Sequence, residues 1–212
     1  MKQEVNPKEN SRARAFDMWM KSPQPMVTIV KTFDVTRLRK VSRRKGMKFN
    51  MLLCWCIGRA ASAIDEFYLL PTNGKLFRYD RLALNVIVNN VKGDISLCDV
   101  PYNDDLEQFS HDYDAITQAT AAACCDSFDE EANIIGTSAV TGTEFDCAIN
   151  QYSGIYNNPF LVWGRYRRCW LRYTLPISFQ FHHAQMDGTQ AARFLEGLQR
   201  AIKGILLKKR DY

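Results

Sequence analysis

Two adjacent histidines mark the segment with the clearest capacity for chemistry. His182 and His183 stand in the stretch FHHAQMDG, residues 181–188, directly after an alternating apolar segment that predicts a strand over residues 171–181. Because successive residues of a strand face opposite sides, only one imidazole can point into a given cleft, so the pair is not a bidentate metal site. An imidazole titrates near pH 6.5 and can take a proton from an alcohol. We therefore expect one of these histidines to act as a general base.

A short turn after the histidines carries the nearest carboxylate. Asp187 follows His183 by four residues and precedes Gly188. Its carboxylate could brace the turn by pairing with a cation, or it could orient the imidazole, and the spacing leaves both open. A structural alternative also exists, in which the histidines are a buried polar pair and Asp187 and Gly188 are only turn residues.

The elements that would position this turn alternate between strand and helix. Strands are predicted at residues 26–33, 75–79, 82–91, 134–140, 161–166 and 171–181. Helices are predicted at residues 35–45, where Gly46 ends the helix, and at residues 51–65, with Asn50 as N-cap. A third helix is predicted after an N-cap at Asn103 or Asp104. A fourth is predicted through residues 191–205, and Lys208, Lys209 and Arg210 lie at the C-terminal end of that helix. Residues 14–20 have weaker helical character. We therefore expect a mixed α/β (α+β) fold in which helices cover a large mixed sheet, and neither a GxGxxG nor a P-loop motif is present.

Length and composition favour a single domain over residues 1–212. Residues 1–14 are polar and charged, which predicts a loose or docked N-terminal arm, and we favour the loose form. The net charge of +5 comes from basic runs scattered along the chain, so we expect no nucleic-acid partner. Seven cysteines without a CxxC pair argue against a disulfide scaffold or a metal site. No apolar run approaches the roughly 20 residues of a membrane span, so we expect a soluble, cytoplasmic protein without a membrane partner.

The turn also carries a family resemblance. His183, Asp187 and Gly188 match the HxxxDG motif of the chloramphenicol acetyltransferases, and His182 precedes it as in that family. The chain resembles this family from about Arg12 onward. Within that stretch, the segment Val100-Pro101-Tyr102 is similar to the family's turn before a long helix. The resemblance implies a CoA-dependent acyltransferase fold and direct acetyl transfer from acetyl-CoA, as co-substrate, to a hydroxyl of chloramphenicol or a similar small alcohol. It also implies a homotrimer with active sites between subunits.

The same resemblance implies a role for individual residues. His183 would be the general base, and Ser138 would donate a hydrogen bond to the oxyanion. Asp187 would pair with an arginine of the arm, either Arg12 or Arg14. The remaining implied roles are CoA binding by Arg165 and Tyr166, and acceptor binding at Ile95 and Val162.

Departures from the family pattern leave the acceptor open. Ile95 replaces a phenylalanine, Val162 replaces a threonine, and Thr141-Gly142-Thr143 stands where the family has a Pro-Trp step. Alternatives are therefore an acyltransferase of the same fold with another acceptor, or a non-catalytic member that binds CoA or another ligand. The motif also occurs in dihydrolipoyl acyltransferases, which carry lipoyl domains that we do not find. Condensation domains, which share it too, need about twice this length.

Overall fold

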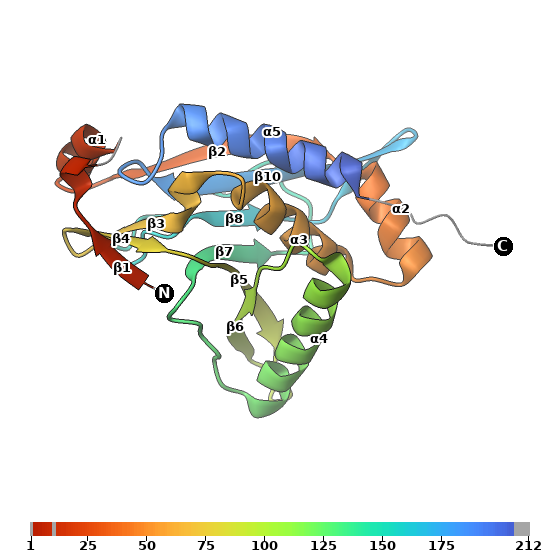
Figure 1. Ribbon diagram of the computed structural model, residues 1–212. Helices are drawn as coiled ribbons and strands as arrows, with labels where there is room; N and C mark the ends of the chain where they lie inside the picture. Colours follow the sequence, from red (N-terminus) through yellow and green to blue (C-terminus); the bar gives the residue numbers. More distant parts are fainter. Residues whose placement is uncertain (1, 10–11, 206–212) are drawn as a thin grey trace.

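The computed structural model describes residues 2–9 and 12–205, and its centre is a seven-stranded sheet (Figure 1). The strands run in the order β2-β10-β8-β7-β5-β6, and β9 pairs with β10 outside this path. Their bounds are β2 Met26–Asp34, β5 Leu82–Asn89, β6 Ile95–Pro101, β7 Asn133–Ala139, β8 Phe160–Trp163, β9 Arg167–Cys169 and β10 Arg172–His182. The pairs β5·β7 and β7·β8 are parallel and the others antiparallel, which confirms the predicted mixed sheet.

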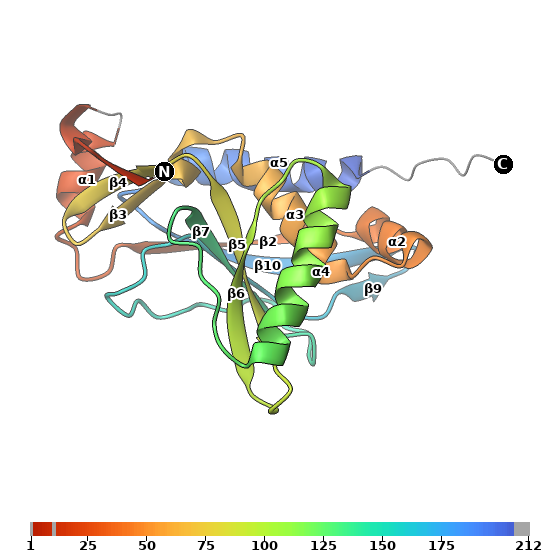
Figure 2. The same ribbon diagram turned by 60° about the horizontal axis from the view of Figure 1, so that its bottom comes forward.

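Helices cover one face of this sheet (Figures 1 and 2). They are α2 Thr36–Lys45, α3 Phe49–Ala61, α4 Leu106–Ala123 and α5 Gly188–Gly204, whereas α1 Ala13–Trp19 lies apart from them, beside the start of β2 (Figure 1). The 3-10 turns are η1 Pro7–Glu9 and η2 Asp65–Tyr68. On β10, every second residue faces these helices and is buried, as its alternating sequence predicts: Leu175, Ile177, Phe179 and Phe181. Phe179 lies 4.6 Å from Phe194 of α5 and 6.1 Å from Phe67 of η2, between ring centroids. The core therefore fixes α5 against the strand that ends at the histidines.

The N-terminal arm belongs to a second, smaller sheet. Strand β1 (Lys2–Val5) pairs with β4 (Lys75–Tyr79), which pairs with β3 (Leu69–Thr72). Phe16 of α1 is buried in a separate apolar cluster with Leu69 and Leu76. The expectation of a loose arm is therefore wrong for these residues, because backbone hydrogen bonds and apolar burial dock it.

Helix boundaries differ from the prediction at three places. Asn50 lies inside α3, whose N-cap is Lys48, and that helix ends at Ala61. The cap of α4 is Asp105, whose carboxylate accepts from the amides of Glu107 and Gln108, and not Asn103 or Asp104. Gly46 ends α2 in the left-handed conformation, with φ of 69°, as expected. Lys208, Lys209 and Arg210 lie outside the described residues.

The second face of the large sheet is only partly covered. Val30, Ser178, Val162 and Ser138 are successive register partners across β2, β10, β8 and β7, so their side chains share this face. The loop at residues 140–159 crosses it, where the Ala148 amide donates to Ser178 Oγ at 2.9 Å. Beyond the loop, apolar side chains remain exposed on the same face: Val30, Ile87, Ile95 and Val140.

Candidate active site

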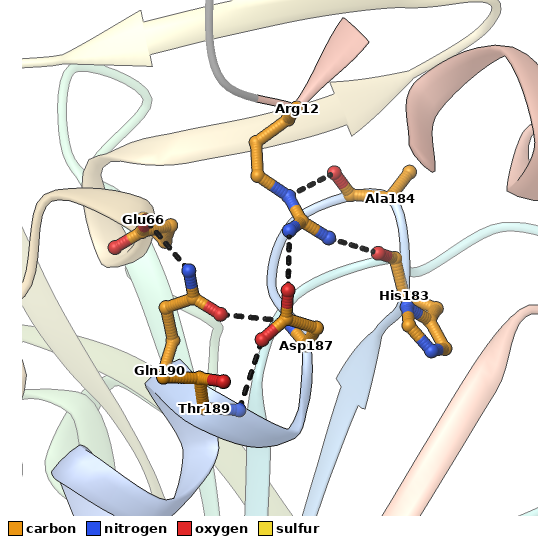
Figure 3. A network of polar contacts seen from close by, with 7 residues as sticks. All are labelled: Arg12, Glu66, His183, Ala184, Asp187, Thr189 and Gln190. Atoms are coloured by element: carbon orange, nitrogen blue, oxygen red, sulfur yellow. Dashed lines mark hydrogen bonds and ion pairs between the residues drawn. The ribbon is translucent and has the colours of Figure 1, made fainter. Parts of the chain in front are cut away.

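The backbone of the turn after β10 holds His183 in place from two sides. Its amide donates to the carbonyl of Pro25 at 2.8 Å, and its own carbonyl accepts from Arg12 Nη2 at 2.8 Å. Arg12 also donates to the carbonyl of Ala184 through Nε at 3.5 Å. Figure 3 shows the guanidinium inserted between the two carbonyls and Asp187.

Asp187 pairs with Arg12, and not with Arg14. Its Oδ2 lies 2.9 Å from Arg12 Nη1, and Arg12 is buried whereas Arg14 is exposed. Partial burial acts to raise the pKa of Asp187, but the pKa lies below its ordinary value because the Thr189 amide and the Arg12 guanidinium stabilise the charged form. The carboxylate bonds to the cation and to the helix start, so it braces the turn and does not contact the imidazole.

The first residues of α5 extend this hydrogen-bond network. Asp187 is the N-cap, and its Oδ1 accepts from the Thr189 amide at 2.9 Å. Gln190 completes a capping box, because its Oε1 accepts from the Asp187 amide at 3.1 Å. Its Nε2 donates to Glu66 Oε1 at 3.1 Å, which ties the turn to η2 (Figure 3).

Helix α1 supplies the residue that packs on the imidazole. The ring of Trp19 stacks on His183 with centroids 4.3 Å apart and an interplanar angle of 5°. Arg12, Phe16 and Trp19 follow one another at intervals of four and three, so one side of α1 faces the turn. This segment therefore holds His183 at two points. Arg12 donates to the backbone carbonyl of His183, and Trp19 stacks on its imidazole ring.

The two histidines have different surroundings. His182 is buried, and its Nδ1 accepts from the Ala184 amide at 3.1 Å. Burial, and secondarily the charge of His183, lower the pKa of His182 to about 4, so it is neutral near pH 7. In His183, Nδ1 is enclosed without a hydrogen-bond partner among the described residues, whereas Nε2 is not enclosed in this way. His183 can thus accept a proton at Nε2, whereas Nδ1 of His182 already accepts from a backbone amide.

Ser138 lies far from His183 within one chain. Ser138 lies on β7, two strands away from β10, and is level with Ser178 of β10. His182 lies four residues beyond Ser178 along β10. At about 3.3 Å per residue and about 4.8 Å between strands, the Cα atoms of Ser138 and His182 are about 16 Å apart. A hydrogen bond from Ser138 to an oxyanion held at His183 of the same chain is therefore impossible without rearrangement.

The two predicted CoA-binding residues are also remote from His183. Arg165 is exposed beside Glu144, with Nε 3.6 Å from Oε1. Tyr166 packs 5.1 Å from Phe49, and its hydroxyl accepts from Arg39 Nε at 3.2 Å. Both lie near the start of β10, whereas His183 follows its end.

The two predicted acceptor positions do not lie together. Ile95 begins the edge strand β6 and is 54% exposed. Val162 is buried beside Ser138. The structure therefore gathers Arg12, His183 and Asp187, and leaves the remaining predicted residues in other parts of the chain.

Comparisons of the sequence with known proteins point to one family. A model of the chloramphenicol acetyltransferase family matches residues 3–199. Chloramphenicol acetyltransferase 2 of Escherichia coli is 25% identical over 201 residues, which cover 92% of this chain and 94% of the relative.

The chain belongs to the chloramphenicol acetyltransferase family.

Solved structures show the same fold. A chloramphenicol acetyltransferase superposes with a TM-score of 0.80 at 20% identity, covering 95% of this chain and all of that one. The cubic core of the pyruvate dehydrogenase multienzyme complex superposes with a TM-score of 0.59 at 19% identity, covering 90% and 88%. Membership of the chloramphenicol acetyltransferase family makes the protein an acyltransferase. Among the described residues, no helix is long and apolar enough to cross a membrane.

Sequence reasoning missed Trp19 and Gln190 in this family member. The spacing of Arg12, Phe16 and Trp19 along one helix side was a usable signal, although it does not reveal what that side packs against. Gln190 stands three residues after Asp187, the spacing of a capping box, so the sequence did contain this sign.

Proposed function

We propose that the protein transfers the acetyl group of acetyl-CoA to a hydroxyl of chloramphenicol or a similar small alcohol, with His183 as general base. The observation that carries the proposal is that the His183 imidazole is held in one position with one ring nitrogen accessible. Its ring is stacked on Trp19, its backbone is bonded to Arg12 and Pro25, and Nε2 is left for a substrate. A fixed base with one accessible nitrogen suits proton removal from an alcohol.

The reaction proceeds by direct attack. His183 Nε2 takes the proton of the acceptor hydroxyl while that oxygen forms a bond to the thioester carbonyl carbon. The tetrahedral oxyanion accepts a hydrogen bond from the hydroxyl of Ser138, a donor worth about 3 kcal/mol of barrier. Collapse of the intermediate breaks the carbon–sulfur bond, and the CoA thiolate takes the proton back from His183. No acyl-enzyme forms.

This chemistry needs two copies of the chain. By strand geometry the Cα atoms of Ser138 and His182 are about 16 Å apart within one copy, and His183 lies one residue beyond His182, so the serine would come from a neighbour. Exposed apolar side chains on the same sheet face as Ser138 support such an interface: Val30, Ile87, Ile95 and Val140. We propose a homotrimer with its active sites between subunits.

We assign CoA binding to Arg165 and Tyr166. Arginine binds phosphate through several donors, and Arg165 is exposed enough to do so. Tyr166 offers a ring for stacking, although Phe49 and Tyr173 already contact it. Because these residues also lie far from His183 in one chain, CoA would meet its acetyl acceptor across the subunit interface.

The acceptor pocket includes Val162 and Ile95 in this proposal. Val162 is buried next to Ser138, so its side chain would lie close to the bound acetyl group. The two aliphatic residues change the fit of an aromatic alcohol by about 1 to 3 kcal/mol, and chloramphenicol is therefore one candidate within a class. We place the reaction in the cytoplasm, and it requires no metal.

The decisive experiment measures release of free CoA thiol from acetyl-CoA with chloramphenicol as acceptor. We expect turnover by the wild type and loss of at least 1,000-fold in His183→Ala. His182→Asn is the matched control, because the amide oxygen can replace Nδ1 as acceptor for the Ala184 amide. Equal activity of His183→Ala and the wild type would overturn the assignment of the base.

A panel of other small alcohols separates the remaining alternatives. Turnover with another alcohol but not with chloramphenicol would keep the acyltransferase and replace the acceptor. Binding of CoA in calorimetry without thiol release from any alcohol would instead favour the non-catalytic alternative.

A further inference from the structure

The tip of the β9–β10 hairpin exposes two large apolar side chains. Cys169 pairs with Arg172, so Trp170 and Leu171 alone form the connecting loop. Trp170 is 91% exposed and Leu171 87%, more than any other large apolar residue that the structure describes. Neither the core nor the proposed active site uses them.

The backbone conformation at the tip is unfavourable for a residue as large as tryptophan. Trp170 has φ of 53°, in the left-handed region. Two-residue hairpin loops favour glycine, asparagine or aspartate at such positions, and a bulky side chain there is strained. The chain therefore keeps a tryptophan where glycine would fold more easily, which points to a use for the ring outside the folded chain.

Each of the two strands that lead to the tip carries an exposed arginine. Arg168 and Arg172 flank it and are exposed, with Asp34 the acidic group near Arg172. Arg165 and Arg167 lie further back and are paired with Glu144 and Asp146.

Helix α2 extends the positive charge at the same end of the molecule. It lies beside the β9–β10 hairpin (Figure 2), where the hydroxyl of Thr36 accepts from the amide of Tyr173 in β10 at 2.8 Å. Its exposed Lys40, Arg43, Arg44 and Lys45 make no ion pair with any residue that the structure describes.

We propose that this hairpin tip binds the surface of an anionic lipid bilayer. Trp170 and Leu171 would enter the boundary between headgroups and acyl chains, where tryptophan is enriched, while the arginines and the α2 cations contact anionic headgroups. A specific protein interface buries about 1,000 Å² or more, which two side chains on a narrow tip cannot supply. Single-stranded nucleic acid would use the tryptophan ring for stacking but has no use for Leu171. The proposal revises our expectation of no membrane partner.

The test is flotation of the full chain with vesicles of phosphatidylglycerol and phosphatidylcholine, or of phosphatidylcholine alone. We expect binding to the anionic vesicles that weakens as salt rises. The double variant Trp170→Gly/Leu171→Ser should lower the partition coefficient at least tenfold without loss of folding, because glycine suits φ of 53°. Ile155→Ser, which alters an exposed apolar residue elsewhere, is the matched control.

Three outcomes would overturn the proposal. The first is equal vesicle binding by the wild type and the double variant. The second is binding to a single-stranded oligonucleotide, lost in the double variant, without vesicle binding. The third is a change of oligomeric state in the double variant, which would make the tip a contact between copies. Acetyl transfer in the absence of lipid should be unchanged in the double variant, so the outcome is separable from the proposed reaction.

Discussion

Adjacent residues of the same type acquire opposite properties at the end of β10. His182 faces the second side of the sheet, is enclosed, and uses Nδ1 to accept from the Ala184 amide. His183 is the first residue beyond the strand, where the chain turns and Arg12 and Trp19 meet it. The difference arises from one step along a strand, which reverses the direction of the side chain.

This difference predicts how stability depends on pH. The pKa of His182 is about 4 in the folded chain and about 6.5 when unfolded. Below pH 6.5 the unfolded chain therefore takes up a proton that the folded chain does not, and stability falls until about pH 4, by about 3 kcal/mol in all. Urea unfolding between pH 7.5 and 4.5 should show this loss.

The dependence should shrink in His182→Asn, which has no group to titrate, and persist in His111→Asn. His111 lies on α4, and its side chain is 77% exposed, so it serves as the matched control. An unchanged pH dependence in His182→Asn would contradict the assignment.

Trp19 predicts a second effect at the scale of a residue. Trp19→Leu removes the ring that stacks on His183, so we expect kcat to fall about tenfold, since stacking contributes about 0.5–1.5 kcal/mol and orientation adds to it. The KM for acetyl-CoA should change little, and Trp19→Phe should recover much of the loss. Steady-state kinetics test this, with Trp170→Phe as control. A rise in KM at constant kcat would instead make Trp19 a substrate-binding residue.

At the scale of elements, α1 joins the N-terminal arm to the turn that carries His183. Arg12→Leu removes the donors to the His183 and Ala184 carbonyls and leaves Asp187 without its cation. We expect a loss of about 3 kcal/mol of stability, and Arg12→Lys should not restore it because an ammonium cannot span three acceptors. Thermal and urea unfolding provide the measurement.

Arg14→Leu is the control for this prediction, because Arg14 is exposed on the same helix. The free energy of unfolding of Arg14→Leu should stay within about 0.5 kcal/mol of the wild-type value. Asp187→Asn should be milder than Arg12→Leu, since asparagine still caps α5. Equal losses in Arg12→Leu and Arg14→Leu would rule out this role of Arg12.

The sequence predicted those elements whose burial pattern is local. The alternation along β10 and the apolar stripe of α5 are each set by one sheet face or one helix side, so both were found. Val100 and Pro101, expected in a turn, lie at the end of β6 because pairing with Leu84 and Ala83 continues that far. The hairpin at Trp170 was missed for a related reason, since its turn lacks the usual glycine.

The site was predictable only in part, for the same physical reason. The motif named His183 and Asp187, and spacing alone could not choose between Arg12 and Arg14 because the choice depends on which side of α1 meets the turn. Ser138, Arg165 and Tyr166 came from resemblance alone. Their distance from His183 follows from strand order and register, which no local pattern contains.

At the scale of the whole molecule, one chain presents His183 and Ser138 at separate places on the same sheet. His183 follows the end of β10, and Ser138 lies level with Ser178 two strands away. If a neighbouring copy supplies Ser138, each site is built from two chains, and a defect in one chain can be corrected by another. A site contained in one chain could not be corrected in this way.

Mixed assemblies test this directly. His183→Ala and Ser138→Ala should each be nearly inactive alone. Co-expressed in equal amounts and assembled at random, they should give about a quarter of the wild-type activity, since a site is intact when its histidine comes from the Ser138→Ala chain and its serine from the other. Mixing the two variants after separate assembly, where no exchange occurs, is the control. Activity in the co-expressed sample no higher than that of the Ser138→Ala protein alone would mean that the sites are not shared, and would remove Ser138 from the mechanism.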